Sequence, residues 1–304
     1  MVADYSVSFK HALVTGPTGI VGTPLCRALG ELGVRVTAFS REVSSSDVPN
    51  AVATVRGNIL SAEDVLRAAA GADVIFHLAA AVHGSASSRS EFARVNIDGT
   101  ANLIAAAQAV GAKLVHVSTV NVAGFKNRQL ADAYAETKSE GEQLVKNAVE
   151  DGLDAVIVRP ATVFGNEIGK AGLIVERLLN GSLRVLPAPS RKISPVWSSD
   201  LADAIVAAGS IGTNGRTYTI AGETVSTREF VARVCDAAGL RRPVISIPGI
   251  LLVLPLQFAW WTRKITRWTP PVSVKSLLNG SEHDGELARL ELGFEYTTIE
   301  EIFG

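Results

Sequence analysis

The sequence predicts an α/β protein built on a doubly wound parallel sheet, with a smaller C-terminal lobe. In the first half of the chain, short apolar runs alternate with longer helical segments, which is typical of βαβ units. The runs are almost continuously apolar, as expected for strands covered by helices on both faces. A glycine-rich turn follows the first run directly, and right-handed crossovers then give a doubly wound sheet.

The elements follow in a regular order up to Pro160, which ends the last run. Strands are expected at 11–15, 34–40, 51–59, 73–80, 113–119 and 154–160. Helices are expected from the glycine-rich turn to about Gly33, and at 61–72, 90–110 and 131–150. Ser61 and Asp64 give the second helix an N-cap and an acid in its first turn.

The pattern becomes irregular beyond Pro160. Further strands are expected at 191–197 and 216–222, and helices at 199–210 and 227–239. All four tryptophans lie in this last third. We therefore expect a dinucleotide-binding Rossmann domain and a substrate-binding lobe, the first formed by 9–164 plus 194–222 and the second by 165–193 plus 223–304.

Composition excludes several classes of function. The 304 residues are 47% hydrophobic and 19% charged, as in globular proteins. A net charge of −1 with scattered cations gives no footprint for nucleic acid. Two cysteines and five histidines lack ligand spacing, so no metal site is expected. No apolar signal segment opens the chain, which favours a cytoplasmic location.

The longest apolar run covers 248–261. A membrane-spanning helix needs about 20 apolar residues, so this run is too short. A buried helix or a wall of the substrate pocket is the favoured interpretation. A contact with the membrane surface or an oligomer face is the alternative.

The segment TGPTGIVG, residues 15–22, has the pattern of a phosphate-binding turn. A pyrophosphate needs close approach to the backbone and gains from the N-terminus of the following helix. Gly16 permits the tight turn, Gly19 the close approach and Gly22 the packing of helix on strand. Dinucleotide binding is therefore predicted, and a glycine-rich turn without a ligand is the alternative.

The end of the second strand indicates which dinucleotide binds. NAD sites usually place an acid there for the ribose hydroxyls, whereas this chain has Ser40 and Arg41. An arginine can bind a 2′-phosphate with its fork of N–H groups. NADP is therefore expected, with NAD as the alternative if Arg41 lies exposed beside the adenine.

The segment YAETK, residues 134–138, carries a tyrosine and a lysine four residues apart. This spacing alone is a weak signal, but on a helix it puts both side chains on one face. Ser118 and Thr119 end the fifth strand, at the edge of the sheet where ligands of such folds bind. A tyrosine has an ordinary pKa of about 10, so proton exchange near neutral pH requires a stabilised phenolate. Lys138 and an oxidised nicotinamide have the right charge to lower that pKa.

Together these motifs resemble those of an extended short-chain dehydrogenase/reductase. The similarity is to the NAD-dependent epimerase/dehydratase and 3-beta-hydroxysteroid dehydrogenase superfamily, and runs from about His11 to Gly304. It rests on TGPTGIVG, YAETK and five further segments, which are HLAA (77–80), VNIDGTANLI (95–104), VSTVNVAG (117–124), RPATVFG (159–165) and VWSSDLADAI (196–205).

The resemblance implies roles for matching positions. Thr119 is the catalytic hydroxyl, Tyr134 the acid/base, and Lys138 the lysine that also binds the nicotinamide ribose. Asn58 stands where the family usually has an aspartate near the adenine. The cofactor is expected against Gly16, Thr18, Gly19, Ile20, Gly22, Ser40, Arg41, Asn58, Ile59, Leu78, Ala79, Ala80, Asn96, Lys138, Pro160 and Val163. The substrate is expected against Val82, Val120, Asn121 and Trp197.

The resemblance also narrows the reaction. Nucleotide-sugar epimerases and dehydratases often carry an arginine seven residues before the late aspartate, here Asp200, and this chain has Ile193. An oxidoreductase acting on an alcohol or carbonyl of a largely apolar small molecule is therefore expected. Because Arg191 could bind a phosphate instead, a nucleotide-sugar epimerase or dehydratase remains an alternative.

A non-catalytic NADP-binding sensor or assembly subunit is a third hypothesis. Such relatives tend to lose the tyrosine–lysine pair, and this chain keeps it. The family commonly dimerises through the helices at 96–110 and 131–150, so a homodimer is an expectation from the resemblance alone.

Overall fold

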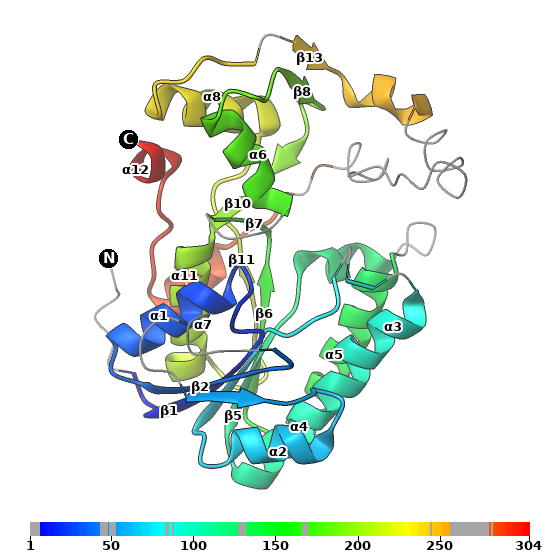
Figure 1. Ribbon diagram of the computed structural model, residues 1–304, viewed down its shortest axis with the longest axis vertical. Helices are drawn as coiled ribbons and strands as arrows, with labels where there is room; N and C mark the ends of the chain where they lie inside the picture. The colour runs from blue at the N-terminus through cyan, green and yellow to red at the C-terminus, as the bar shows by residue number, and fades with distance from the viewer. Residues whose placement is uncertain are drawn as a thin grey trace.

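The computed structural model describes residues 7–42, 48, 53–82, 85–86, 88–126, 132–165, 170–243, 245–255, 280 and 282–304. Its main feature is a seven-stranded sheet of order β11-β6-β5-β4-β1-β2-β3, in which every neighbouring pair is parallel (Figure 1). The strands are β1 (His11–Thr15), β2 (Arg35–Ser40), β3 (Ala53–Arg56), β4 (Val74–His77), β5 (Lys113–Val117), β6 (Ala155–Pro160) and β11 (Thr217–Ile220). The predicted α/β fold class is confirmed.

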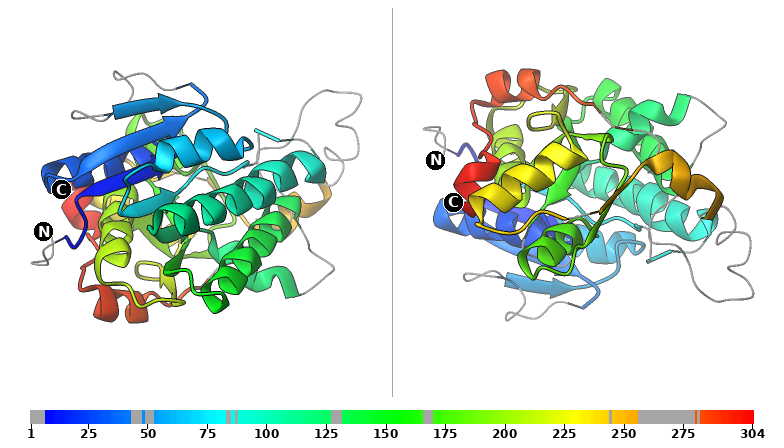
Figure 2. Two further views of the ribbon diagram at one scale, coloured as in Figure 1. Left: turned by 90° about the horizontal axis from the view of Figure 1, so that it is seen from below. Right: turned by 90° about the horizontal axis from the view of Figure 1, so that it is seen from above.

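Helices cover both faces of the sheet, as the crossover rule requires. One face carries α1 (Gly22–Glu31) and α7 (Ser198–Ile211), and the other carries α2 (Ala62–Ala69), α4 (Gly99–Val110) and α5 (Ala133–Glu150). Figure 2 shows the two helix layers from below, with the sheet between them. Two separate hydrophobic clusters fill the two interfaces.

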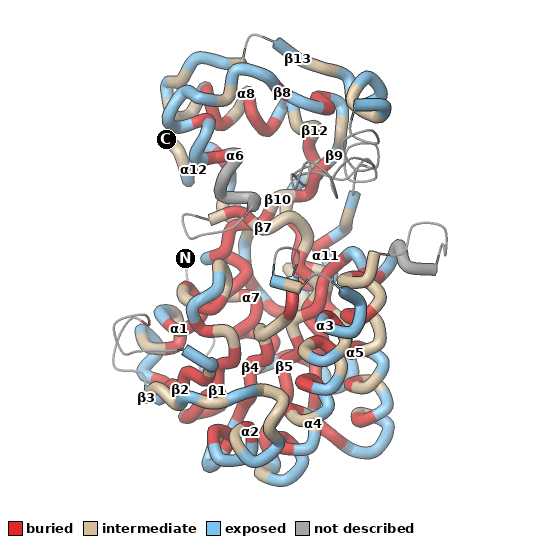
Figure 3. The backbone as a smooth tube through the Cα atoms, turned by 45° about the vertical axis from the view of Figure 1, so that its right-hand side comes forward, coloured by how far each residue is buried: buried red, intermediate tan, exposed pale blue. Residues whose placement is uncertain are grey.

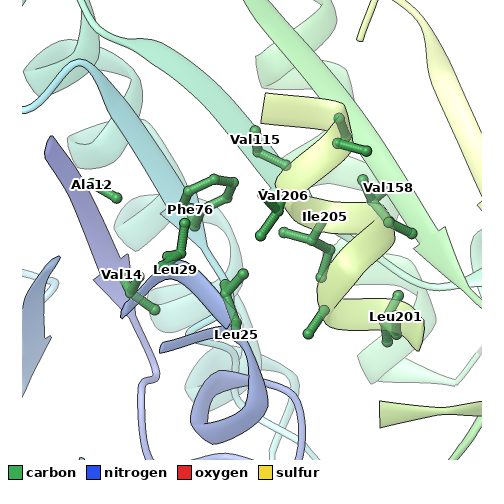
Figure 4. Close-up of a cluster of buried hydrophobic side chains, with 14 of the residues drawn as sticks. Ala12, Val14, Leu25, Leu29, Phe76, Val115, Val158, Leu201, Ile205 and Val206 are labelled. Carbon is green, nitrogen blue, oxygen red and sulfur yellow. The ribbon is translucent and has the colours of Figure 1, made fainter. Parts of the chain in front are cut away.

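Alternation along the strands explains why they are apolar throughout. Successive side chains of a strand point to opposite faces of a sheet. In β1, Ala12 and Val14 therefore belong to the cluster under α1 and α7, while Leu13 belongs to the cluster under α2, α4 and α5. Figure 4 shows the first cluster, where Phe76 and Val115 face Ile205 and Val206 of α7.

Two helix starts follow the sequence closely. The Ser61 hydroxyl accepts a hydrogen bond from Asp64 N at 3.2 Å, so the predicted N-cap of α2 is confirmed. Asp132 caps α5 in the same way.

The helix predicted at 90–110 is not continuous. It comprises α3 (Arg89–Ala93), a π-helical turn η1 (Arg94–Asp98) and α4. Such turns recur at functional sites, where one extra residue per turn redirects a side chain. The strand predicted at 191–197 is likewise two short strands, β9 (Lys192–Ile193) and β10 (Pro195–Trp197), separated by Ser194.

A smaller lobe lies across the carboxyl ends of the strands. It contains α6 (Lys170–Leu179) and α8 (Thr227–Ala237), which Figure 2 shows from above. The short strands are β7 (Thr162–Phe164), β8 (Val185–Pro187), β9, β10, β12 (Val225–Ser226) and β13 (Ile245–Ile247). A third hydrophobic cluster around Phe164, Trp197 and Phe230 holds the lobe together.

The C-terminal residues do not all belong to this lobe, which corrects the predicted boundary. Helix α11 (Glu286–Leu292) packs on α7 and β11, and Ala288, Leu292 and Phe294 join the sheet's own core. Only α12 (Ile299–Phe303) returns to the lobe, against α8. The apolar face of α11 therefore completes the dinucleotide domain.

The described part of the apolar run at 248–261 is not the buried helix of the favoured interpretation, although Pro248 and Ile250 line a cavity of the lobe. This part forms a helical segment, 249–255, in which Ile250, Leu251 and Leu254 are 68%, 65% and 76% exposed. Gly249, Leu252 and Val253 are half-buried, because the segment continues the thin edge formed by β8 and β13, drawn mostly as exposed in Figure 3. Residues 256–261 lie outside the described part. Within the described ranges, no helix has the length and apolarity needed to cross a membrane.

Candidate active site

The glycine-rich turn between β1 and α1 needs glycine for two different reasons. Gly16 has a φ of +69°, and a Cβ there would lie 3.0 Å from Ala79 N. A Cβ on Gly22 would lie 2.1 Å from Gly16 O. A Cβ on Gly19, in contrast, would meet only Gly16 O, at an ordinary 3.4 Å. The fold itself therefore excludes side chains at Gly16 and Gly22 but not at Gly19, where close approach of a ligand stays a prediction.

The start of α1 suits a phosphate group. The first N–H groups of a helix lack intrahelical partners and favour negative charge. Here Val21 occupies the N-cap position and gives no side-chain cap, and the first turn contains no acid. Thr18 and Gly19 are exposed and Ile20 is half-buried beside this turn. These residues fit the pyrophosphate of a dinucleotide.

The loop after β4 forms one wall of this site. The Thr15 hydroxyl accepts hydrogen bonds from Leu78 N at 3.2 Å and Ala79 N at 3.1 Å, which fixes the loop against β1. Leu78, Ala79 and Ala80 are half-buried. On the other side, a Cβ on Gly165 would lie 3.6 Å from Ile20 Cγ1, so the end of RPATVFG reaches the glycine-rich turn. Pro160 is buried and Val163 half-buried on the way there.

The predicted adenine end combines exposed and anchored residues. Ser40 ends β2 half-buried, and Arg41 is exposed after it. Asn58 is exposed, and its Oδ1 accepts a hydrogen bond from Leu60 N at 3.0 Å, so a bond from an adenine amino group would be its second. Ile59 lies against α4, where a Cβ on Gly99 would be 3.2 Å from its side chain. Contact of these residues with a cofactor stays a prediction.

Asn96 lies in the π-helical turn and connects two parts of the site. Its Oδ1 accepts from Ala81 N at 2.8 Å, while its Nδ2 donates to Ala81 O at 3.2 Å and to the Thr137 hydroxyl at 3.0 Å. The side chain is almost completely buried. These bonds fix the loop after β4 against α5, and direct contact of Asn96 with a cofactor stays a prediction.

Thr119 and Tyr134 come together as the sequence predicted. Thr119 follows β5, Tyr134 lies in the first turn of α5, and a hydrogen bond joins their side chains. The Tyr134 ring also contacts Phe92, with ring centroids 6.3 Å apart. The arrangement places a hydroxyl and a phenol together beyond the carboxyl end of the sheet, the usual ligand site of such folds.

The pKa of Tyr134 differs from the expectation. Burial and the nearby Asp132 carboxylate raise it to about 12, and the Thr119 hydrogen bond opposes them only partly. The expected lowering is therefore wrong for the protein on its own. Two positive charges, Lys138 and an oxidised nicotinamide, were expected to stabilise the phenolate. Lys138 is not among the groups that shift the pKa of Tyr134, so the charge of the nicotinamide is the one that would lower it.

Lys138 is buried one turn after Tyr134. Its Nζ donates to Val117 O at 2.8 Å, which holds the side chain against the end of β5. Burial lowers its pKa to about 8, although the charge of Glu142 opposes this shift. The ammonium form therefore still predominates near neutral pH.

Sequence reasoning missed the ion pair behind Lys138. Glu142 lies four residues after Lys138, and its carboxylate is 3% exposed. Arg159 binds it with two hydrogen bonds, Nε to Oε1 at 2.8 Å and Nη2 to Oε2 at 2.6 Å. The spacing of Tyr134, Lys138 and Glu142 at intervals of four was the available signal, because it places all three on one helical face.

Two neutral histidines also lie in this region. His77 and His116 are fully buried side by side on β4 and β5, with ring centroids 5.2 Å apart. Burial, helped by the charge of Lys138, lowers the pKa of His77 to about 3 and that of His116 well below its usual value. Both rings are therefore uncharged at neutral pH, and they add no cation beside Lys138.

The predicted substrate residues occupy different surroundings. Val120 is buried, Val82 and Asn121 are exposed, and Asn121 N donates to the Thr119 hydroxyl at 3.3 Å. Trp197 packs in the core of the lobe, with ring centroids 6.0 Å from Phe164 and 5.3 Å from Phe303. This burial gives Trp197 a packing role, and its contact with a substrate stays a prediction.

Metal-binding groups are absent from the described part of the chain, where no three His, Cys, Asp or Glu side chains cluster. Cys26 and Cys235 are both buried.

Comparison with known proteins decides the family. The sequence profile of the NAD dependent epimerase/dehydratase family matches residues 12–221. The chain belongs to this family. It is therefore an enzyme of the extended short-chain dehydrogenase/reductase type, whose members use NAD(P).

Individual relatives cover nearly the whole chain. The chain is 30% identical to 2-alkyl-3-oxoalkanoate reductase of Stenotrophomonas maltophilia, over 93% of both chains. It is 29% identical to 3-beta-hydroxysteroid dehydrogenase of Mycolicibacterium neoaurum, over 94% of this chain and 87% of the relative. Among solved structures, UDP-glucose 4-epimerase of Thermus thermophilus in complex with NAD is 26% identical with a TM-score of 0.64, covering 78% of this chain and 86% of that one.

Proposed function

We propose that this enzyme transfers a hydride between NAD(P) and the alcohol or carbonyl carbon of a largely apolar small molecule, with Tyr134 as the acid/base. The observation that carries the proposal is the hydrogen bond between Thr119 and Tyr134, with Lys138 buried one turn away. The glycine-rich turn that fits a pyrophosphate lies in the same sheet edge, after β1.

The roles of the side chains follow from their chemistry. The nicotinamide, when bound, supplies or accepts the hydride. The Thr119 hydroxyl donates to the substrate oxygen and holds it beside Tyr134. Tyr134 gives its proton to that oxygen during reduction and takes it back during oxidation. Lys138, fixed by Val117 O one turn after Tyr134, would bind the nicotinamide ribose and so hold the cofactor beside the phenol.

Two observations support a largely apolar substrate. Ile193 stands where nucleotide-sugar enzymes often have arginine, and it is buried and pairs with Val225 in the lobe. Two relatives that cover most of the chain are named for a reductase of 2-alkyl-3-oxoalkanoates and a dehydrogenase of 3-beta-hydroxysteroids. Both names describe hydride transfer at an oxygen-bearing carbon of a mainly hydrocarbon molecule.

The test is turnover of a panel of ketones and secondary alcohols by the wild type, Tyr134→Phe and Lys138→Met. Loss of a general acid/base typically costs about 10²–10⁴-fold in rate, so Tyr134→Phe should lose at least ~100-fold in kcat while still binding the cofactor. Tyr296→Phe is a matched control. The Tyr296 hydroxyl accepts a hydrogen bond from Ala221 N, and it is not part of the Thr119–Tyr134 pair. Full activity of Tyr134→Phe would reject the assignment.

A second candidate, a nucleotide-sugar epimerase or dehydratase, is favoured by the likeness to the UDP-glucose 4-epimerase. The proposed oxidoreductase changes the redox state of its cofactor at each turnover, whereas an epimerase restores it.

A sensor that binds cofactor without catalysis is the remaining hypothesis. It predicts no turnover by the wild type on any substrate, and no effect of Tyr134→Phe on cofactor binding.

A further inference from the structure

The substrate lobe contains a cavity of about 560 Å³ that the proposed chemistry does not use. Its polar lining comes from Ser190, Arg191, Lys192 and Glu282, and its apolar lining includes Pro248 and Ile250. The loop that carries Arg191 runs into β9 and β10, and β10 pairs with β7 (Figure 3). The cavity therefore belongs to the part of the lobe that adjoins the end of RPATVFG.

Arg191 is a half-buried cation at the wall of this cavity. Its Nε is buried and has no hydrogen-bond partner, and burial lowers the pKa of the guanidinium. Within the described ranges, no carboxylate forms an ion pair with it. The neighbouring sequence from 237 to 281, which includes the Ile250 segment, contains no Asp or Glu at all. Buried polar groups normally have partners, so an unpartnered one at a cavity wall indicates a ligand.

The backbone fixes Arg191 in this position. Arg191 N donates to Ala188 O at 3.0 Å, and Arg191 O accepts from both Thr227 N at 2.8 Å and the Thr227 hydroxyl at 2.9 Å. Ala188, which also lines the cavity, has a φ of +49° and is the one non-glycine residue with positive φ in the described part. Such strained positions persist where surrounding structure enforces them, and they cluster at ligand sites.

The charges of the lining select the ligand. Arg191 and Lys192 contribute two positive charges and Glu282 one negative charge, so the cavity has a net charge of +1. This balance matches a monoanion, and Glu282 would repel the second charge of a dianion. The planar guanidinium matches a carboxylate with two parallel N–H bonds. Ile250, which is 68% exposed, offers a surface to an apolar chain attached to that carboxylate.

We infer that this cavity binds the carboxylate of an amphiphilic monocarboxylic acid, whose apolar chain lies along Pro248 and Ile250. As a statement about the substrate, the inference rests on the proposed function: the reduced or oxidised carbon would belong to a hydroxy or keto acid with a hydrocarbon chain. As a statement about binding, it stands on Arg191 and its cavity alone.

The experiment measures binding rather than turnover. Decanoate carries no group that the proposed chemistry could oxidise or reduce, so calorimetric titration of the full chain with decanoate, with and without NADP⁺, isolates the carboxylate site. Charge-assisted hydrogen bonds contribute roughly 1.5–3 kcal/mol, so Arg191→Gln should weaken decanoate binding at least ~10-fold. Arg184→Gln is the matched control, because Arg184 is an exposed arginine of the same lobe outside the cavity lining. It should leave affinity unchanged.

Three probes and one further variant sharpen the test. Decanol and decyltrimethylammonium should bind weakly and equally to the wild type and to Arg191→Gln. Decyl phosphate should bind the wild type less tightly than decanoate, and Glu282→Gln should improve its binding. Arg191→Gln should keep the Tm of the wild type, because within the described part of the chain Arg191 Nε has no hydrogen-bond partner and the side chain forms no ion pair.

Several results would overturn the inference. These are no decanoate binding at millimolar concentration, equal decanoate affinity in Arg191→Gln, equal binding of decanol, or tighter binding of decyl phosphate or UDP than of decanoate. None of these outcomes depends on catalysis. If Tyr134→Phe loses turnover but decanoate does not bind as expected, the proposed function stands and only the inferred carboxylate site is rejected.

Discussion

At the scale of single residues, Asp132 acts in two opposing ways on Tyr134. Its carboxylate caps α5 by accepting from Tyr134 N at 3.1 Å, which stabilises the start of the helix that carries the proposed acid/base. The same negative charge helps to hold the pKa of Tyr134 at about 12, away from the range that proton exchange near neutral pH requires. Asp132 therefore stabilises the helix but makes Tyr134 harder to ionise.

Replacing Asp132 with asparagine should separate the two effects. Asparagine caps helices about as well as aspartate, but it carries no charge. In Asp132→Asn the pKa of Tyr134 should fall, because the phenolate no longer faces a carboxylate. Alcohol oxidation, which needs the phenolate, should then reach full rate at lower pH than in the wild type. The pH profile of kcat and the ultraviolet titration of tyrosinate both report this shift. An unchanged profile, with folding intact, would remove Asp132 from the electrostatics of the site.

The residue types of this site could be predicted from sequence, but their ionisation could not. The spacing of Tyr134 and Lys138 and the position of Thr119 after a strand are local properties of the chain. The pKa of Tyr134 depends on how far the ring is buried, including its contact with Phe92, which α3 brings from a different part of the chain. Such burial is a property of the packed molecule.

At the scale of elements, the Glu142–Arg159 ion pair connects α5, which carries Tyr134 and Lys138, to the sheet. Glu142 belongs to α5 and Arg159 to β6, immediately before Pro160. The pair therefore fixes Lys138 and Tyr134 relative to the segment predicted to flank the nicotinamide. Burial alone would raise the pKa of Glu142, but the hydrogen bonds and charge of Arg159 outweigh it, so the pKa is lowered.

Replacing one residue of this ion pair should lower the free energy of unfolding strongly, and replacing both residues should lower it much less. Loss of one partner of a buried pair typically costs about 3–5 kcal/mol. Because the Arg159 side chain is 23% exposed, Glu142→Leu should lie at the lower end of that range. The double variant Glu142→Leu/Arg159→Leu should recover part of the loss, which urea unfolding of both single variants and the double variant measures as a coupling energy. Additive single effects would mean that the pair contributes nothing as a pair.

The elements themselves show where sequence patterns succeed. The six strands up to Pro160 and their helices follow the apolar runs, because all of these strands except the edge strand β3 are largely buried on both faces. The π-helical turn at Arg94–Asp98 was missed because a single turn of five residues is too short to show a change of period in the sequence. The short strands β7, β8 and β13 were also missed, because two- or three-residue strands carry too little periodicity.

At the scale of the whole molecule, the chain passes repeatedly between the dinucleotide domain and the lobe. Asp200 at the start of α7 accepts from Thr297 N at 2.8 Å and from the Thr297 hydroxyl at 2.7 Å, just before α12 enters the lobe. The return of α11 to the sheet was not predictable, because its apolar side chains are equally compatible with packing on the lobe. A cofactor bound along the sheet edge should therefore stabilise the molecule as one unit.

The choice of cofactor should be visible in this stabilisation. A ligand that binds only the folded state at 100 times its Kd adds about 2.7 kcal/mol. If Arg41 binds a 2′-phosphate, NADP⁺ should raise the Tm more than NAD⁺ at equal concentration, and Arg41→Ala should abolish the difference. Thermal unfolding with each dinucleotide measures both effects. A larger shift with NAD⁺, unaffected by Arg41→Ala, would reverse the preference.

The most direct test of the central claim follows the hydride itself. The enzyme is incubated with a panel of apolar ketones and keto acids and with NADPH or NADH deuterated at C4 of the nicotinamide, and the products are examined by mass spectrometry. Deuterium should appear on the new carbinol carbon with one oxidised cofactor per product, and Tyr134→Phe should show neither. Epimerisation of a nucleotide sugar without net oxidation of the cofactor, and without transfer to any ketone, would contradict it.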